Sequence, residues 1–179
     1  MDKDHQPGKK RARPTRGTEY PPPAPTPWIP VLHIDDDAND RELFLTATLE
    51  ADVPFQVLSL SHAGQAIALL SGADIYGDRR RFPLPRLIVL DLKMPCSSGI
   101  DVLRWVRSRP ELSRVPVIVL SGSASEEDMR QAYACGANAY LIKPLGFAAL
   151  IEMIKGVNLS WFVTPQNGAL EFNRHFSRA

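Results

Sequence analysis

Residues Val31 to Asp37 read VLHIDDD. A short, mainly apolar run leads directly into three adjacent aspartates. Runs of this kind are typical of β-strands that are buried in a parallel sheet. Neighbouring carboxylates repel one another, and burying them removes favourable hydration. The pattern therefore raises the question of what stabilises so much negative charge at the end of a buried strand.

The same kind of run recurs along the chain, and it alternates with helical periodicity. Strands are predicted at 30–34, 55–60, 86–90, 115–120 and 138–142. Helices are predicted between and after them, at 38–50, 62–71, 99–108, 125–135 and 146–156. Five strands alternating with five helices predict one doubly wound α/β domain over residues 28–156. Ser125 with Asp128 fits a capping box at the fourth helix, and Gly136 fits its C-terminal stop.

The segments on either side of this domain have different compositions. Residues 1–27 contain seven of the sixteen prolines and carry a net charge of +3, so we predict a disordered, Pro-rich basic tail. Residues 157–179 are predicted to form a C-terminal extension, partly packed and partly disordered, because LSWFV at 159–163 is apolar. No second domain fits after residue 156, so the sequence indicates no DNA-binding output module.

Composition and charge exclude several functional classes. Residues 28–179 carry a net charge of −2, which does not indicate a nucleic-acid partner. No apolar run reaches membrane-spanning length and no signal peptide is visible, so we predict a cytoplasmic protein without a membrane partner. Cys96 and Cys135 lack metal-ligand spacing, which indicates reduced thiols rather than a zinc site or a disulfide framework.

Polar side chains follow four of the predicted strands. Asp35 and Asp36 follow the first strand, Asp91 the third, Ser121 the fourth and Lys143 the fifth. Ligands of parallel α/β sheets bind beyond the carboxyl ends of the strands, so we expect these side chains to share one edge. Mg²⁺ among the carboxylates would make their clustering tolerable, and it would also attract phosphate.

Asp91 is the candidate nucleophile of this edge. A carboxylate beside a metal ion can attack phosphorus and become an aspartyl phosphate, and Asp91 stands alone after the most continuous apolar strand. Lys143 would pair with the carboxylate or the phosphoryl group. Ser121 would donate a hydrogen bond to a phosphoryl oxygen.

Four motifs together resemble response-regulator receiver domains of the CheY-like type. They are IDDD at 34–37, LDLKMPCSSG at 90–99, VLSGS at 119–123 and AYLIKP at 139–144. The resemblance implies a flavodoxin-like fold with a five-stranded parallel sheet. It also implies that a sensor histidine kinase transfers a phosphoryl group to Asp91.

The resemblance also implies roles for the neighbouring residues. Asp36, Asp91 and the backbone carbonyl of Lys93 would bind Mg²⁺ directly, and Asp35 would act through water. Lys93 stands at a variable position of the family, at the rim of the site, where its charge could alter dephosphorylation or partner access.

A second set of residues would contact and sense the phosphoryl group. Ser121 and Tyr140 would form the switch, and Gly122, in place of a commoner Ala, would leave room beside the phosphoryl group. The Lys143–Pro144 peptide bond would be cis. Phosphorylation would then reshape the face made by the fourth helix, fifth strand and fifth helix, which acts by binding a partner or by forming a homodimer.

A narrower resemblance concerns small stand-alone receivers that partner bacterial phytochrome kinases. It rests on the long connection at 72–85 together with a C-terminal extension that contains Trp161. It implies a sensor histidine kinase of the phytochrome type as the upstream partner.

Alternative interpretations remain open from the sequence. Asp35–Asp37 alone fits a solvated helix start, and Tyr140 alone fits a packing residue. An intact fold that never receives phosphate would be a pseudo-receiver scaffold. An aspartate-nucleophile phosphatase needs a second Asp where Lys93 stands, so we expect no enzyme beyond slow self-dephosphorylation. His33, inside a strand, is predicted to be a core histidine.

Overall fold

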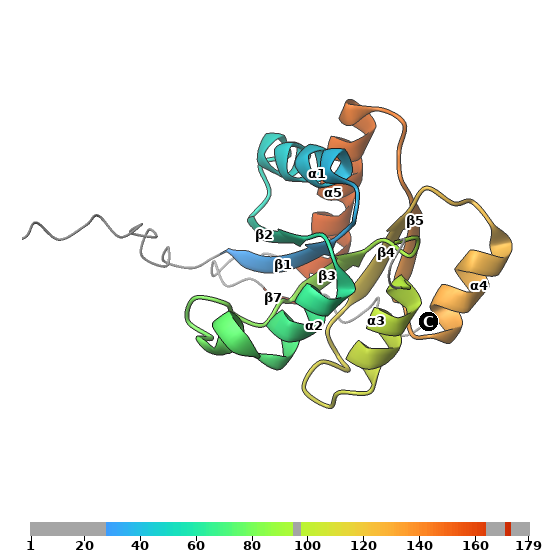
Figure 1. Ribbon diagram of the computed structural model, residues 1–179. Helices are drawn as coiled ribbons and strands as arrows, with labels where there is room; N and C mark the ends of the chain where they lie inside the picture. Colours follow the sequence, from blue (N-terminus) through green and yellow to red (C-terminus); the bar gives the residue numbers. More distant parts are fainter. Residues whose placement is uncertain (1–27, 95–97, 164–170, 173–179) are drawn as a thin grey trace, which may run out of the picture.

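A computed structural model describes residues 28–94, 98–163 and 171–172 (Figure 1). Five of its strands form one parallel sheet in the order β2–β1–β3–β4–β5. They are β1 Ile29–Ile34, β2 Phe55–Leu60, β3 Leu87–Leu90, β4 Val117–Ser121 and β5 Ala139–Ile142. This order is that of flavodoxin-like folds. Strands are added on one side of β1 first and then on the other, so the strand order reverses between β1 and β3. The predicted fold class is therefore confirmed, and ligands are expected at the β1/β3 switch point.

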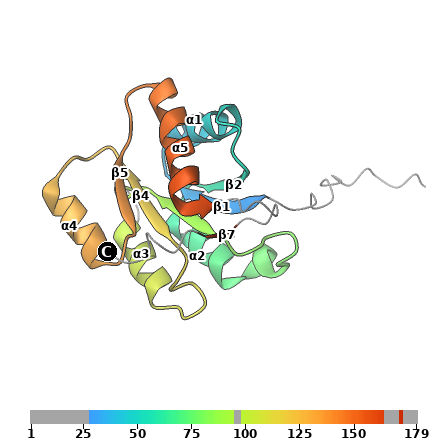
Figure 2. The ribbon, with the colours of Figure 1, turned by 180° about the vertical axis from the view of Figure 1, so that it is seen from behind.

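Helices cover both faces of the sheet. They are α1 Ala38–Glu50, α2 Ala63–Ser71, α3 Gly99–Arg107, α4 Glu126–Ala134 and α5 Phe147–Trp161, with a short 3-10 helix at Asp74–Gly77. Helices α1 and α5 lie side by side on one face, and α2 and α3 lie on the other, with α4 beside β5 (Figures 1 and 2). In the described part of the chain, no helix is both long and apolar enough to cross a membrane.

The core explains why the strands read as continuous aliphatic runs. Leu32, Ile34 and Leu90 pack with α2 and α3, whereas Val31 and Val89 pack with α1 and α5. Every residue of β3 and of β4 is buried, because both strands lie inside the sheet with helices on each side. Such strands carry polar residues only where they end. The site is therefore confined to the carboxyl ends of the parallel strands.

Helix α5 runs past residue 156, where we expected it to end, and stops at Trp161. Trp161 and Phe162 are both buried, and the Phe162 ring meets the Phe55 ring edge-on at a centroid distance of 5.7 Å. The pair Phe162–Val163 then forms an antiparallel ladder with Glu171–Phe172. The start of the predicted extension therefore packs on the sheet. The predicted tail at 1–27 and residues 164–170 and 173–179 lie outside the described residues.

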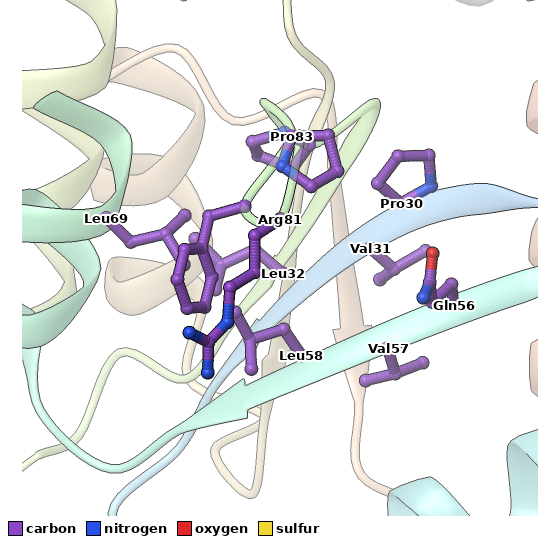
Figure 3. A pocket seen from close by; sticks show the side chains of 11 residues that line it. Pro30, Val31, Leu32, Gln56, Val57, Leu58, Leu69, Arg81 and Pro83 are labelled. Carbon is purple, nitrogen blue, oxygen red and sulfur yellow. The ribbon is translucent and has the colours of Figure 1, made fainter. Parts of the chain in front are cut away.

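The long connection between α2 and β3 folds against the domain. Arg79 donates hydrogen bonds to the carbonyls of Leu69 and Leu70 at 2.7 and 2.8 Å, and so satisfies the C-terminal end of α2. Arg81 and Pro83 lie over β1 and β2 (Figure 3). Between this connection and the two strands is a mostly apolar cavity of about 180 Å³.

The start of α4 differs from the predicted capping box. Ser125 occupies the N-cap position, but its side chain caps no backbone N–H. Asp128 instead accepts a hydrogen bond from the Ser123 hydroxyl, which lies two residues before the cap. The predicted box is therefore wrong, because Asp128 engages the Ser123 hydroxyl and the Ser125 backbone N–H donates to the Ser123 Oγ at 3.3 Å. Gly136 follows the helix with a φ of 95°, which confirms the predicted stop.

Candidate functional site

Asp37 is the N-cap of α1 and not part of the acidic cluster. Its side chain accepts hydrogen bonds from the backbone N–H groups of Asn39 and Asp40, at 2.7 and 3.1 Å. The bonds from Asp40 and then Asn39 hold the pKa of the Asp37 carboxyl below its usual value. The helix-start interpretation of the aspartate run is therefore right for this one residue.

Arg41 fixes the loop that carries the other two aspartates. Its Nη1 donates to the backbone carbonyls of both Asp35 and Asp36, each at 2.8 Å. Arg41 thus sets the direction of the loop, and sequence reasoning did not identify it.

Lys143 is the counter-charge that the aspartate run requires. Its Nζ donates to Oδ2 of Asp35, of Asp40 and of Asp91, each at 2.7 Å. Burial alone would lower the pKa of Lys143, but its hydrogen bonds with these three carboxylates raise the pKa above its usual value. Lys143 is therefore a firmly charged ammonium at the centre of the sheet edge.

Asp35 is the most deeply buried carboxylate of the site, with 1% of its surface exposed. Burial raises the pKa of its carboxyl, and the hydrogen bond from Lys143 opposes that rise only in part. The Asp37 backbone N–H also donates to Asp35 Oδ1 at 3.0 Å. The carboxylate is thus held by fixed donors, and a further cation beside it would be favourable.

The geometry fits a divalent cation. Asp35, Asp36 and Asp91 each offer one carboxylate oxygen, and these three atoms lie within 4.8 Å of one another. Mg²⁺ and Mn²⁺ take oxygen ligands and keep several waters, so two or three carboxylates suffice. The sequence prediction that these residues meet is confirmed. The backbone carbonyl of Lys93 as a further ligand stays a prediction.

Asp91 is oriented by donors on both of its oxygens. The backbone N–H of Lys93 donates to Oδ1 at 3.0 Å, and Lys143 donates to Oδ2. The start of α3 comes so close that a Cβ at Gly99 would lie 2.2 Å from the Asp91 carbonyl oxygen. Only glycine permits this approach, which fixes the loop after β3 against the helix that follows.

Ser121 and Gly122 lie at the carboxyl end of β4, which pairs with β3 in the sheet. Ser121 is the last residue of the strand, one residue beyond the predicted end, and it is buried. Its Oγ accepts a hydrogen bond from the Ser123 backbone N–H at 3.3 Å. A Cβ placed on Gly122 would have no described atom within 4 Å, so the space at that position is open.

Tyr140 is tied to the loop that follows Ser121. Its hydroxyl donates to the carbonyl of Ser123 at 2.9 Å, and its backbone N–H donates to the Tyr133 hydroxyl at 3.1 Å. The side chain is half-buried. These contacts place it where it can respond to that loop, and its role as a switch stays a prediction.

The peptide bond between Lys143 and Pro144 is not cis, because no cis peptide bond occurs in the described residues. The expectation rested on the family resemblance alone. A trans bond is the intrinsically favoured state even before proline. In this chain the trans bond already lets Lys143 reach all three carboxylates.

His33 is a core histidine, as predicted. Its ring stacks on Phe44 with centroids 4.1 Å apart, and its Nδ1 lies 3.0 Å from the Ser59 Oγ. Its Nε2 is 3.8 Å from Asp35 Oδ2. Burial, with smaller effects of Lys143 and Arg41, lowers the pKa of His33 to about 3. The ring is therefore neutral in the folded protein at neutral and mildly acidic pH.

This neutral histidine makes stability depend on pH. The pKa is lower in the folded protein than in the unfolded chain, so acidification favours unfolding from about pH 6.5 downwards. Between pH 7 and 4.5 the free energy of unfolding should fall by about 2–3 kcal/mol through His33. Urea unfolding at both pH values should show a smaller fall in His33→Leu. His62→Gln, which changes an exposed histidine, should keep the wild-type fall, and equal falls in all three proteins would contradict the assignment.

The strand order and the acidic edge define a receiver of two-component signalling. The chain belongs to the response regulator receiver domain family, whose model matches residues 31–155. Response regulator Rcp1 of Synechocystis sp. is 30% identical over 134 residues, which are 75% of this chain and 89% of Rcp1.

Solved structures agree with this assignment. The phosphorylated cyanobacterial phytochrome response regulator RcpA matches with a TM-score of 0.69 at 29% identity, over 80% of this chain and 99% of RcpA. The Mn²⁺-bound form of Rcp1 matches with a TM-score of 0.64 at 29% identity, over 73% of this chain and 91% of that one. The family therefore contains both a phosphorylated and a metal-bound relative of similar fold.

Proposed function

We propose that this protein is a phosphorylation switch in which Asp91 accepts a phosphoryl group from a histidine of a sensor kinase. An Asp91 carboxylate oxygen attacks phosphorus while the bond from phosphorus to the histidine nitrogen breaks. The observation that carries this proposal is the joint placement of Lys143 and the carboxylate cluster around Asp91. Lys143 would pair with the transferred group, and Ser121 would donate to one of its oxygens.

Mg²⁺ is the proposed cofactor. Bound at the carboxylate cluster, it would neutralise charge on the phosphoryl oxygens. Asp36 and Asp91 are the proposed direct ligands with the Lys93 carbonyl, and Asp35 the ligand through water. The Mn²⁺-bound form of the relative Rcp1 supports a divalent ion as the cofactor.

A sensor histidine kinase is the proposed upstream partner. The relatives include a phytochrome response regulator, which supports a kinase of the phytochrome type. We propose a cytoplasmic protein whose partners are proteins, not nucleic acid or membrane, in line with the near-neutral charge balance.

The proposed output is a change of the face formed by α4, β5 and α5. Ser121 moving toward the phosphoryl group would pull the loop that Tyr140 holds. This face already exposes apolar side chains: Tyr133, Ile142, Leu145 and Phe147. Exposed apolar surface of this kind suits a protein partner or a second copy of the chain.

Phosphatase activity is the weaker alternative. The position that would need a general acid holds Lys93, whose Nζ is paired with Asp128 at 3.0 Å. We therefore propose a phosphoacceptor that turns over no phosphate ester and only loses its own phosphoryl group slowly. If phosphorylation failed, the protein would instead be a pseudo-receiver scaffold.

Phosphoryl uptake tests the proposal. With acetyl phosphate and Mg²⁺, the intact mass should rise by one phosphoryl group, and an excess of chelator should abolish the rise. The same treatment with sensor kinase and ATP extends the test to the natural donor class. No mass gain from either donor in the presence of Mg²⁺ would reject the phosphoacceptor and favour the scaffold.

A further inference from the structure

Lys93 and Asp128 connect the loop that follows Asp91 with the first turn of α4. Lys93 follows Asp91 by two residues, and Asp128 lies in the first turn of α4. The Lys93 Nζ is 3.0 Å from Asp128 Oδ2, with 62% of the Lys93 side chain and 24% of the Asp128 side chain exposed. The ion pair therefore spans from the acceptor loop to the start of α4.

Asp128 is also connected to the switch residues. It accepts a hydrogen bond from the Ser123 hydroxyl. The backbone N–H of Ser123 donates to the Ser121 Oγ at 3.3 Å, and its carbonyl accepts from the Tyr140 hydroxyl at 2.9 Å. One continuous set of contacts thus runs from Lys93 through Asp128 and Ser123 to both proposed switch residues.

The charges place Lys93 between two acidic centres. Hydrogen bonding with Asp128 is the main cause that raises the pKa of Lys93, and the charge of Asp91 adds to it. The Ser123 hydroxyl and then Lys93 lower the pKa of Asp128. The backbone N–H of Lys93 already contacts Asp91 Oδ1 at 3.0 Å, so its flexible side chain starts beside the acceptor.

We infer that Asp128 is a positioning residue that holds the Lys93 ammonium away from the acceptor until a phosphoryl group on Asp91 competes for it. A phosphoryl group carries a charge of about −1.5 to −2, which exceeds that of one carboxylate. When Lys93 turns to the phosphoryl group, the first turn of α4 loses its tie to the acceptor loop. This inference rests on the proposed phosphoacceptor function and adds a second link between the site and α4.

The competing explanation is an ordinary surface ion pair without influence on the site. Helix α4 offers a matched control. Glu127, the residue before Asp128, forms an exposed ion pair with Arg130. Glu127→Gln removes the same charge from the same turn and leaves Lys93 untouched. It therefore controls for the general electrostatic field of the helix.

Affinity for beryllofluoride, a phosphoryl mimic, tests the inference by titration calorimetry in saturating Mg²⁺. Asp128→Asn should tighten binding about two- to fivefold, because Lys93 no longer has to break an ion pair before it reaches the bound mimic. Glu127→Gln should change the affinity by less than about 1.5-fold. In a Lys93→Met background, Asp128→Asn should have no effect. Amide spectra of Asp128→Asn should shift at Ser123 and the first turn of α4 toward the positions of the beryllofluoride-bound wild type.

Each contrary outcome has a distinct meaning. Equal tightening by Asp128→Asn and Glu127→Gln, or tightening that persists in Lys93→Met, would overturn the inference while the phosphoacceptor function stands. Absence of beryllofluoride binding by the folded wild type, together with no mass gain from acetyl phosphate, would overturn both. Normal binding with unchanged affinity in Asp128→Asn would reject the positioning role alone.

Discussion

Asp91→Asn is expected to abolish phosphoryl uptake completely. The amide is nearly isosteric with the carboxylate, and its single oxygen can still accept one of the two hydrogen bonds, either from Lys143 or from the Lys93 backbone N–H. Its oxygen is a poor nucleophile, and an attack on phosphorus would not give a stable aspartyl phosphate. Intact mass after treatment with acetyl phosphate and Mg²⁺ should show one added phosphoryl group in wild type and none in the variant.

A matched control separates the acceptor from other surface carboxylates. Asp101→Asn removes an exposed carboxylate in the first turn of α3, where it pairs with Arg104 outside the acidic cluster. This variant should gain one phosphoryl group like wild type. A gain in Asp91→Asn equal to that of wild type would mean that another residue is the acceptor, and peptide mapping would then locate it.

The main site could be predicted from sequence because parallel strands share an edge. Asp91, Ser121 and Lys143 each stand at the carboxyl end of a predicted parallel strand, so their placement on one side of the sheet followed from topology without any knowledge of side-chain direction. Asp40 was missed although it contacts Lys143 at 2.7 Å. It lies inside a helix, and only the direction of that helix across the sheet brings it to the ammonium.

Local competition explains why the predicted capping box failed. Ser125 and Asp128 have the spacing of a capping box, yet Asp128 engages Ser123 and Lys93 instead. Spacing along a sequence cannot rank a capping partner against a lysine from the loop after β3. The predictions for residues 1–27 and for Cys96 fall outside the described residues and stay predictions.

Lys143→Met is expected to lower the free energy of unfolding by about 2–4 kcal/mol in the absence of divalent ions, because it leaves buried carboxylates without a counter-charge. Asp35 is fully buried and Asp91 nearly so, whereas Asp40 can turn to solvent. Loss of the ammonium should raise the pKa of Asp35 further, because the hydrogen bond from Lys143 now opposes that rise, so the deficit should shrink as the pH falls and this carboxylate becomes neutral. Urea unfolding at pH 7.5 and 5, with chelator present, measures both effects.

Mg²⁺ should stabilise Lys143→Met more than it stabilises wild type. The ion supplies the positive charge that the variant lacks, and it no longer competes with an ammonium held 2.7 Å from Asp35 and Asp91. Lys155→Met is the control, because Lys155 forms an exposed pair with Glu152 on α5, and its loss should cost less than about 0.5 kcal/mol without any dependence on Mg²⁺. If Lys143→Met were as stable as Lys155→Met in chelator, Lys143 would not be the charge that makes the aspartate cluster tolerable. The cluster would then have to rely on protonation of Asp35, which burial already favours by raising its pKa.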